Sequence, residues 1–156
     1  MRPDYLEIAA RSPDSIRGKW GLSREVILAA LAADGLAIRH AHAGWMFEAR
    51  ARDPQVVTGG TVEGLAVPEE YCLVAVRQNG FAVGHLAGPS LSVRLEAVRQ
   101  DPMALELIRD KTRDLVREGV LREPRAARFL GPASLAWVKP LVEGTHGNWL
   151  EYYLAA

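Results

Sequence analysis

The residues of this sequence that could bind a metal ion are its four histidines, His40, His42, His85 and His146. His40 and His42 are two residues apart, and His85 could supply a third imidazole, a ligand type that zinc and copper accept. However, His40 and His85 each follow an Asp or Asn by six positions, as equivalent members of an internal repeat would. Because a repeat accounts for both residues, we expect no bound metal and no cofactor.

Cys72 is the single cysteine, so no internal disulfide and no cysteine metal cluster can form. A catalytic thiol needs a histidine and electropositive surroundings, and the neighbouring sequence supplies neither. We therefore expect Cys72 to be a small, half-buried hydrophobic residue.

Two further patterns resemble functional motifs but have structural explanations. The Thr-Gly-Gly-Thr of residues 58–61 is followed by no lysine, so it is not a phosphate-binding loop, and we expect a surface loop. Glu48 and Glu96 occupy equivalent repeat positions, which favours exposed helix positions over an acid–base pair. We predict no catalytic residue and no enzyme activity. A small hydrolase that uses Cys72 or the histidines is the weakest alternative.

An internal repeat predicts the elements that position these residues. Residues 72–83 (CLVAVRQNGFAV) and residues 94–105 (RLEAVRQDPMAL) share one pattern, twenty-two residues apart. The shared frame is an apolar residue, a free position, Ala, an apolar residue, two mostly polar positions, Asp or Asn, and Gly or Pro. A third copy turns at Asp34, and a degraded fourth turns at Asp53, where Arg50 replaces an apolar residue.

Each copy predicts two short helices around a turn, and repeats of this length are typical of stacked units. The alanine of the frame is small enough for neighbouring helices to approach closely, and its copies are Ala30, Ala49, Ala75 and Ala97. The Asp or Asn should cap the second helix. The following Gly, in the left-handed conformation, or the following Pro should end the first.

Helices are also predicted outside the tightest copies. Residues 24–33, opened by Ser23, place their apolar residues on one helical face. Residues 103–118 resemble one longer helix. Two shorter helices, 124–130 and 132–138, each begin with Pro, and we expect Pro140 to end the second.

The fold class that these patterns predict is all-α, with short helix-turn-helix repeats stacked as a small solenoid. We place the repeats in residues 22–110 and a C-terminal helical cap in residues 111–156. The whole chain, residues 1–156, is interpreted as a single domain.

Residues 73–82 (LVAVRQNGFA) and their copies resemble the bacterial and viral repeats known as domain of unknown function 4116. Members of that family look like strings of LxAVxQNGxALxY, and the resemblance covers about residues 22–110. It implies short helical repeats, in a family that occurs in bacteria, phages and large viruses. The family often has Tyr or His after its second apolar pair, and the corresponding residues here are His40, Gly59, His85 and Leu107. No activity is assigned to the family.

The composition weakens several functional classes. The 156 residues include nineteen basic and nineteen acidic ones, so the net charge is zero, and this disfavours a nucleic-acid binder. No segment approaches the ~20 apolar residues that a membrane span requires. The N-terminus has no apolar core of signal-peptide length. We expect a cytoplasmic protein that makes no membrane contact.

The function we predict is a non-enzymatic protein-binding module, such as an inhibitor or adaptor in phage–host conflict, with anti-CRISPR-like inhibition as one version. The candidate partner-binding residues are repeated polar positions and aromatic residues, Arg50, Arg52, Arg77, Gln78, Arg99, Gln100, Trp45, Trp149, Tyr152 and Tyr153. The alternative is a nucleic-acid-binding accessory protein that uses an Arg/Gln ladder. We expect binding where the repeat is broken, at residues 50–60 or in the aromatic tail.

Overall fold

The computed structural model describes residues 4–148, and in this part of the chain the secondary structure is mostly helical. The sheet found among these residues has two strands. The prediction of an all-α fold is therefore confirmed.

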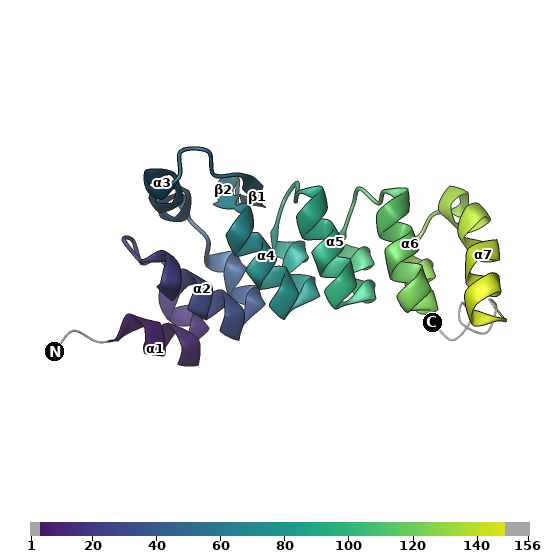
Figure 1. Cartoon of the computed structure of the whole chain (residues 1–156), viewed down its shortest axis with the longest axis horizontal. Helices are drawn as coiled ribbons and strands as arrows, with labels where there is room; N and C mark the ends of the chain where they lie inside the picture. The colour runs from purple at the N-terminus through teal and green to yellow at the C-terminus, as the bar shows by residue number, and fades with distance from the viewer. Residues whose placement is uncertain (1–3, 149–156) are drawn as a thin grey trace.

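Most of the helices form a row in which each unit is an α-helix followed by a 3₁₀ helix (Figure 1). The units are α1 (Tyr5–Arg11) with η1 (Pro13–Ile16), α2 (Arg24–Ala33) with η2 (Gly35–His40), α4 (Glu69–Gln78) with η3 (Gly80–His85), α5 (Leu91–Gln100) with η4 (Pro102–Leu107), and α6 (Arg113–Arg122) with η5 (Pro124–Phe129). The final helix, α7 (Pro132–His146), packs against α6. Along the row, successive α-helices contact one another, and so do successive 3₁₀ helices. The assignment of this row to a solenoid stays a prediction.

Each unit turns at one residue, and these residues are Ser12, Asp34, Asn79, Asp101 and Glu123. The backbone of the last four is extended. In the last four, a side-chain oxygen accepts a hydrogen bond from the N–H two residues later, at 2.9 Å for Asp34 and 3.2 Å for Glu123. This confirms the predicted capping role. Ser12 lies twenty-two residues before Asp34, and Glu123 lies twenty-two residues after Asp101. Neither turn was predicted from the repeat in the sequence.

The glycines after these turns have a different role from the one predicted. Gly35 and Gly80 begin 3₁₀ helices and do not adopt the left-handed conformation. Instead, each lies against the backbone of the next α-helix. A Cβ at Gly80 would be 2.6 Å from the carbonyl oxygen of Ala97, and a Cβ at Gly35 would overlap that of Ala75. Ala75 and Ala97 are fully buried, as close helix approach requires.

Two predicted helices have different bounds. The predicted helix over residues 103–118 is wrong, because η4 ends at Leu107 and α6 begins at Arg113, after the Thr112 cap. The prediction that Pro140 ends the last helix is also wrong, because α7 continues through it to His146. Pro140 is exposed, so water can solvate the carbonyl that loses its helical donor.

One helix and the hairpin stand outside the row, at the top of Figure 1. They are α3 (Ala43–Arg52), β1 (Thr58–Val62) and β2 (Leu65–Pro68). Helix α2 packs directly on α4, while α3 packs on β2. Asp53 makes the predicted turn, because its Oδ1 accepts the N–H of Gln55 at 2.9 Å. The second helix predicted after it is wrong, since no 3₁₀ helix follows. Arg50, which broke the sequence frame, is exposed.

The predicted surface loop at residues 58–61 is instead strand β1, paired antiparallel with β2. Gly59 and Gly60 are buried there. A Cβ on Gly59 would be 2.6 Å from the Cα of Glu69, so only glycine lets the strand lie on α4 at this point.

The hydrophobic core extends along the row. One cluster of buried residues reaches from Ala9 of α1 to Ala126 of η5, and a second joins α6, η5 and α7 around Val116 and Val138. Among residues 4–148, no helix is long and apolar enough to cross a membrane.

Candidate protein-binding surface

The two glutamines of the predicted ladder bind within the chain. The Oε1 of Gln78 accepts a hydrogen bond from the N–H of Gly35 at 2.6 Å, and Gln100 does the same for Gly80 at 2.6 Å. Each glutamine thereby holds the turn of the preceding unit. Arg122 stands at the glutamine position of the next unit. The turn before it carries Pro102, which has no N–H to donate, and Arg122 instead donates to the carbonyl of Arg99 at 2.9 Å.

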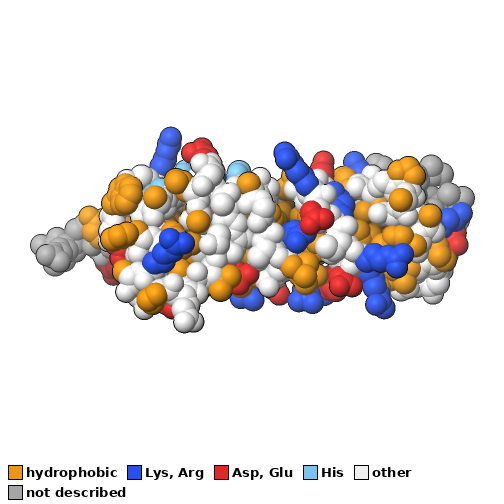
Figure 2. Space-filling model, turned by 90° about the horizontal axis from the view of Figure 1, so that it is seen from above, with side chains coloured by type: hydrophobic (Ala, Val, Ile, Leu, Met, Phe, Trp, Pro, Cys, Tyr) orange, Lys and Arg blue, Asp and Glu red, His pale blue; other side chains and the backbone are white. Residues whose placement is uncertain are grey.

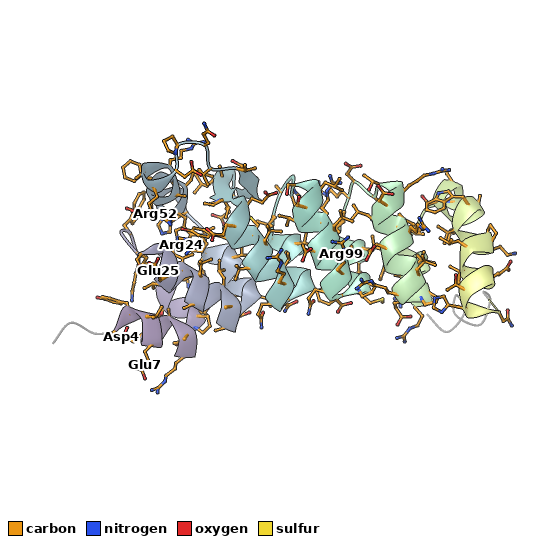
Figure 3. All side chains as sticks on the ribbon, in the orientation of Figure 1. Asp4, Glu7, Arg24, Glu25, Arg52 and Arg99 are labelled. Carbon is orange, nitrogen blue, oxygen red and sulfur yellow. The ribbon has the colours of Figure 1, made fainter. Side chains whose placement is uncertain are left out.

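Two arginines, Arg77 and Arg99, form ion pairs, and each pairs with a glutamate of the next α-helix in the row. Arg77 on α4 pairs with Glu96 on α5 at 3.0 Å, and Arg99 pairs with Glu96 at 3.3 Å and with Glu118 on α6 at 3.4 Å. Arg99 extends from α5 in Figure 3. The guanidinium of Arg77 lowers the pKa of Glu96. Arg77 and Arg99 are therefore engaged within the chain, and the nucleic-acid alternative stays a prediction.

Trp45, predicted as a surface anchor, is 1% exposed and belongs to the core. Its ring packs edge-on against Tyr71, with centroids 5.8 Å apart. Arg52 donates to the hydroxyl of Tyr71 at 2.8 Å, and it lies near Arg24 where α3 meets the row (Figure 3). The other aromatic candidates, Trp149, Tyr152 and Tyr153, lie outside the described residues.

The histidines do not form a ligand cluster. His40 bonds Asp14 at 2.7 Å, while His85 lines a hollow together with Gly84 and Leu107. Burial is the main cause that lowers the pKa of His85. In residues 4–148, no group of three or more His, Cys, Asp or Glu side chains is arranged to hold a metal ion.

Cys72 is fully buried, which corrects the expected half-buried position. Its Sγ would be 2.9 Å from a Cβ built on Gly59, so strand β1 covers it. Burial, with a smaller effect of Glu69, raises the pKa of the thiol to about 12. At neutral pH the sulfur is therefore a protonated, covered thiol.

The broken repeat carries an apolar hollow of about 580 Å³, which we call the α3 groove. Its lining residues are Trp20, Ala43, Met46, Phe47, Arg50, Ala51, Leu65 and Ala66. The five contributed by α3 have helical spacing and form one face of that helix. Figure 2, seen from above, shows hydrophobic side chains at both ends of the molecule, including the end that carries α3.

Two aromatic side chains dominate the α3 groove. Trp20 is 69% exposed and Phe47 is 70% exposed, the largest exposed fractions among the big hydrophobic side chains described. Phe47 occupies the frame position that Leu73 and Leu95 hold in the row. Those leucines are partly buried and pack on the core, whereas the position on α3 has no such cover.

His42 fixes Trp20 beside α3. The Nδ1 of His42 accepts the N–H of Gly44 at 3.1 Å, which leaves Nε2 to donate to the carbonyl of Lys19 at 2.8 Å. The Trp20 ring lies 5.0 Å from the imidazole, centroid to centroid. One histidine therefore ties the loop that carries Trp20 to the first turn of α3, so the exposed indole is held in place.

Arg50 is the one charged residue among those lining the α3 groove. It is exposed, and none of the hydrogen bonds or ion pairs found in residues 4–148 uses its guanidinium. An apolar hollow with an unpaired cation favours an apolar ligand that also carries a negative charge.

The broken repeat and Arg50 are predicted from the sequence, whereas Trp20, Phe47 and Leu65 are not among the predicted binding residues. Comparisons with protein-family models, curated proteins and solved structures found no match. The resemblance to domain of unknown function 4116 therefore stays a prediction.

Proposed function

We propose that this protein is a non-enzymatic helical-repeat module that binds another protein through the α3 groove. The observation that carries the proposal is the pair of highly exposed aromatic side chains, Trp20 and Phe47, at the edge of one apolar hollow. Buried Trp and other large aromatic anchors supply much of the binding energy in protein interfaces. Contiguous exposed apolar surface is typical of interaction sites.

The row of paired helices supports the proposal by presenting α3 on a fixed base. Helix α3 packs on β2, and the hairpin in turn packs on α4. An inhibitor or adaptor role in phage–host conflict, with anti-CRISPR-like inhibition as one version, is the setting that we propose. A cytoplasmic location is part of the same proposal.

The test compares proteins captured from the native host by matched variants. Phe47→Ser removes an anchor of the α3 groove, and Leu107→Ser removes an exposed apolar side chain of η4 that lines a different hollow. We expect the wild type and Leu107→Ser to capture the same protein, and Phe47→Ser to lose it. With the purified partner, Phe47→Ser should weaken binding by at least about thirtyfold, which corresponds to about 2 kcal/mol.

Equal binding by both variants would overturn the proposal. Capture of RNA with an affinity that falls steeply as salt rises would instead support the nucleic-acid alternative.

A further inference from the structure

Within residues 4–148, strand β2 pairs on one side only, with β1. On the other side of the hairpin, the N–H of Thr61 donates to the carbonyl of Ala87 at 2.9 Å, and the N–H of Ala87 donates to the carbonyl of Thr61 at 2.8 Å. Both backbone groups of Thr61 therefore point away from β2. Because Thr61 lies opposite Ala66, these two residues form the pair of the antiparallel ladder that exchanges no hydrogen bonds.

The same alternation sets the direction of the backbone at Ala66. Its N–H and C=O must point away from β1, as those of Thr61 point away from β2. Of the backbone hydrogen bonds that residues 4–148 form beyond their regular elements, none involves Ala66. A free N–H and C=O on a strand edge form a template for another strand.

This edge opens onto the α3 groove, because Leu65 and Ala66 are themselves part of its lining. Ala66 is partly exposed and Leu65 is 39% exposed, so a ligand can reach them. A residue of a partner placed opposite Ala66 would exchange two hydrogen bonds with it, as Ala87 does with Thr61. The hairpin would then carry a paired segment on each side.

The rest of the α3 groove defines the chemistry of that segment. In an extended chain, side chains alternate between two faces, so residues on either side of the paired position point the same way. Phe47 and Met46 offer them apolar contact, and Arg50 offers a charge-assisted bond to a carboxylate.

Resting on the proposed function, we infer that the α3 groove binds an extended segment of its partner protein, which adds as a strand to β2 at Ala66. The segment carries apolar side chains and an Asp or Glu that pairs with Arg50. Backbone hydrogen bonds to Ala66 provide affinity, and the apolar and acidic side chains provide specificity.

The test selects binders from a random peptide library displayed on phage, using the full-length protein as the target. Peptides that also bind Phe47→Ser are discarded, so that the remaining ones depend on the α3 groove. A parallel selection uses Arg50→Glu. We expect apolar residues at alternate positions with an acidic residue among them, and replacement of that acid by Lys or Arg in the second selection.

Backbone pairing is then measured with synthetic copies of a selected peptide, N-methylated at one residue at a time. Methylation at the residue opposite Ala66 should weaken binding about tenfold or more, because it deletes one N–H donor. Methylation at the two adjacent residues, whose N–H groups face away, should have a much smaller effect.

The outcomes separate this inference from the proposed function. Groove-dependent peptides with apolar residues three and four positions apart would indicate a bound helix, which overturns strand addition while the protein-binding function stands. A methylation profile with no single sensitive residue would do the same. If no peptide depends on Phe47, both the inference and the proposed site fail.

Discussion

The close approach between η3 and α5 predicts that Gly80→Ala destabilises the fold. The added Cβ would be 2.6 Å from the carbonyl oxygen of Ala97, whereas ordinary contact begins at 3.4 Å. Ala97 is fully buried in a helix, so this oxygen can move away only if the two units separate. Such overpacking costs about 1–3 kcal/mol.

Part of this cost is offset in the unfolded state. Gly80 has a negative φ that alanine can adopt, and replacing glycine there restricts the unfolded chain, which contributes up to about 1 kcal/mol of stability. We therefore expect a net loss of about 1–2 kcal/mol. In a chain of this size that lowers the melting temperature by roughly 2–8 °C.

The assay is reversible urea unfolding followed by far-UV circular dichroism, with Gly144→Ala as the matched control. Gly144 lies in α7, and a Cβ there would have no atom within 4 Å. The control should be stabilised by up to about 1 kcal/mol, because alanine is the better helix former. A Gly80→Ala protein as stable as the wild type, beside a stabilised control, would refute the close approach.

Three further predictions concern the contacts between units. Gln100→Leu should destabilise the fold by about 1–2 kcal/mol in urea unfolding, because the buried N–H of Gly80 loses its acceptor. Gln100→Glu keeps an acceptor and should lose less stability. Equal losses of stability in the two variants would contradict this role of Gln100. Glu96→Gln should cost about 1 kcal/mol or less at neutral pH. Because Arg77 lowers the pKa of Glu96, the stability that the carboxylate contributes is present above the usual Glu pKa and is lost as the pH falls through the lowered pKa. The unfolding free energies of the wild type and Glu96→Gln should therefore converge in acid. A difference that grows in acid would contradict the ion pair. Cys72, with its pKa raised to about 12, should react with thiol reagents at mildly alkaline pH only as fast as the chain opens, and rapid labelling of the native protein would show that the thiol is accessible.

Local chemistry explains which parts of the fold could be predicted from the sequence. Helix α2 has the predicted bounds because Ser23 caps its start and Asp34 ends it, and both signals lie within the segment itself. The unit at Glu123 was missed because Glu stands where the frame has Asp or Asn. The longer side chain of Glu123 still accepts the N–H of Arg125, so the turn tolerates a change that the pattern did not allow.

The candidate site could be predicted only in part, because exposure depends on neighbours. Phe47 stands at an apolar frame position, where the sequence predicts a partly buried residue like Leu73. Its exposure results from the displacement of α3 out of the row, and that displacement follows from the pairing of β1 with β2 and the packing of Gly59 on α4. These contacts join residues that are far apart in the sequence, so they cannot be predicted from periodicity along the chain.

The same displacement separates the α3 groove from the contacts that hold the row together. Because α2 packs directly on α4, the main core is continuous past the point where α3 leaves the row. Phe47 and Trp20, each more than two-thirds exposed, contribute little burial to it. Their replacement by Ser should therefore change stability by about 0.5 kcal/mol or less. Two large aromatic side chains that contribute little to the core, one of them fixed in place by His42, are what the proposed binding surface requires. If either replacement instead unfolds the protein, folding alone accounts for these residues and they no longer indicate a binding surface.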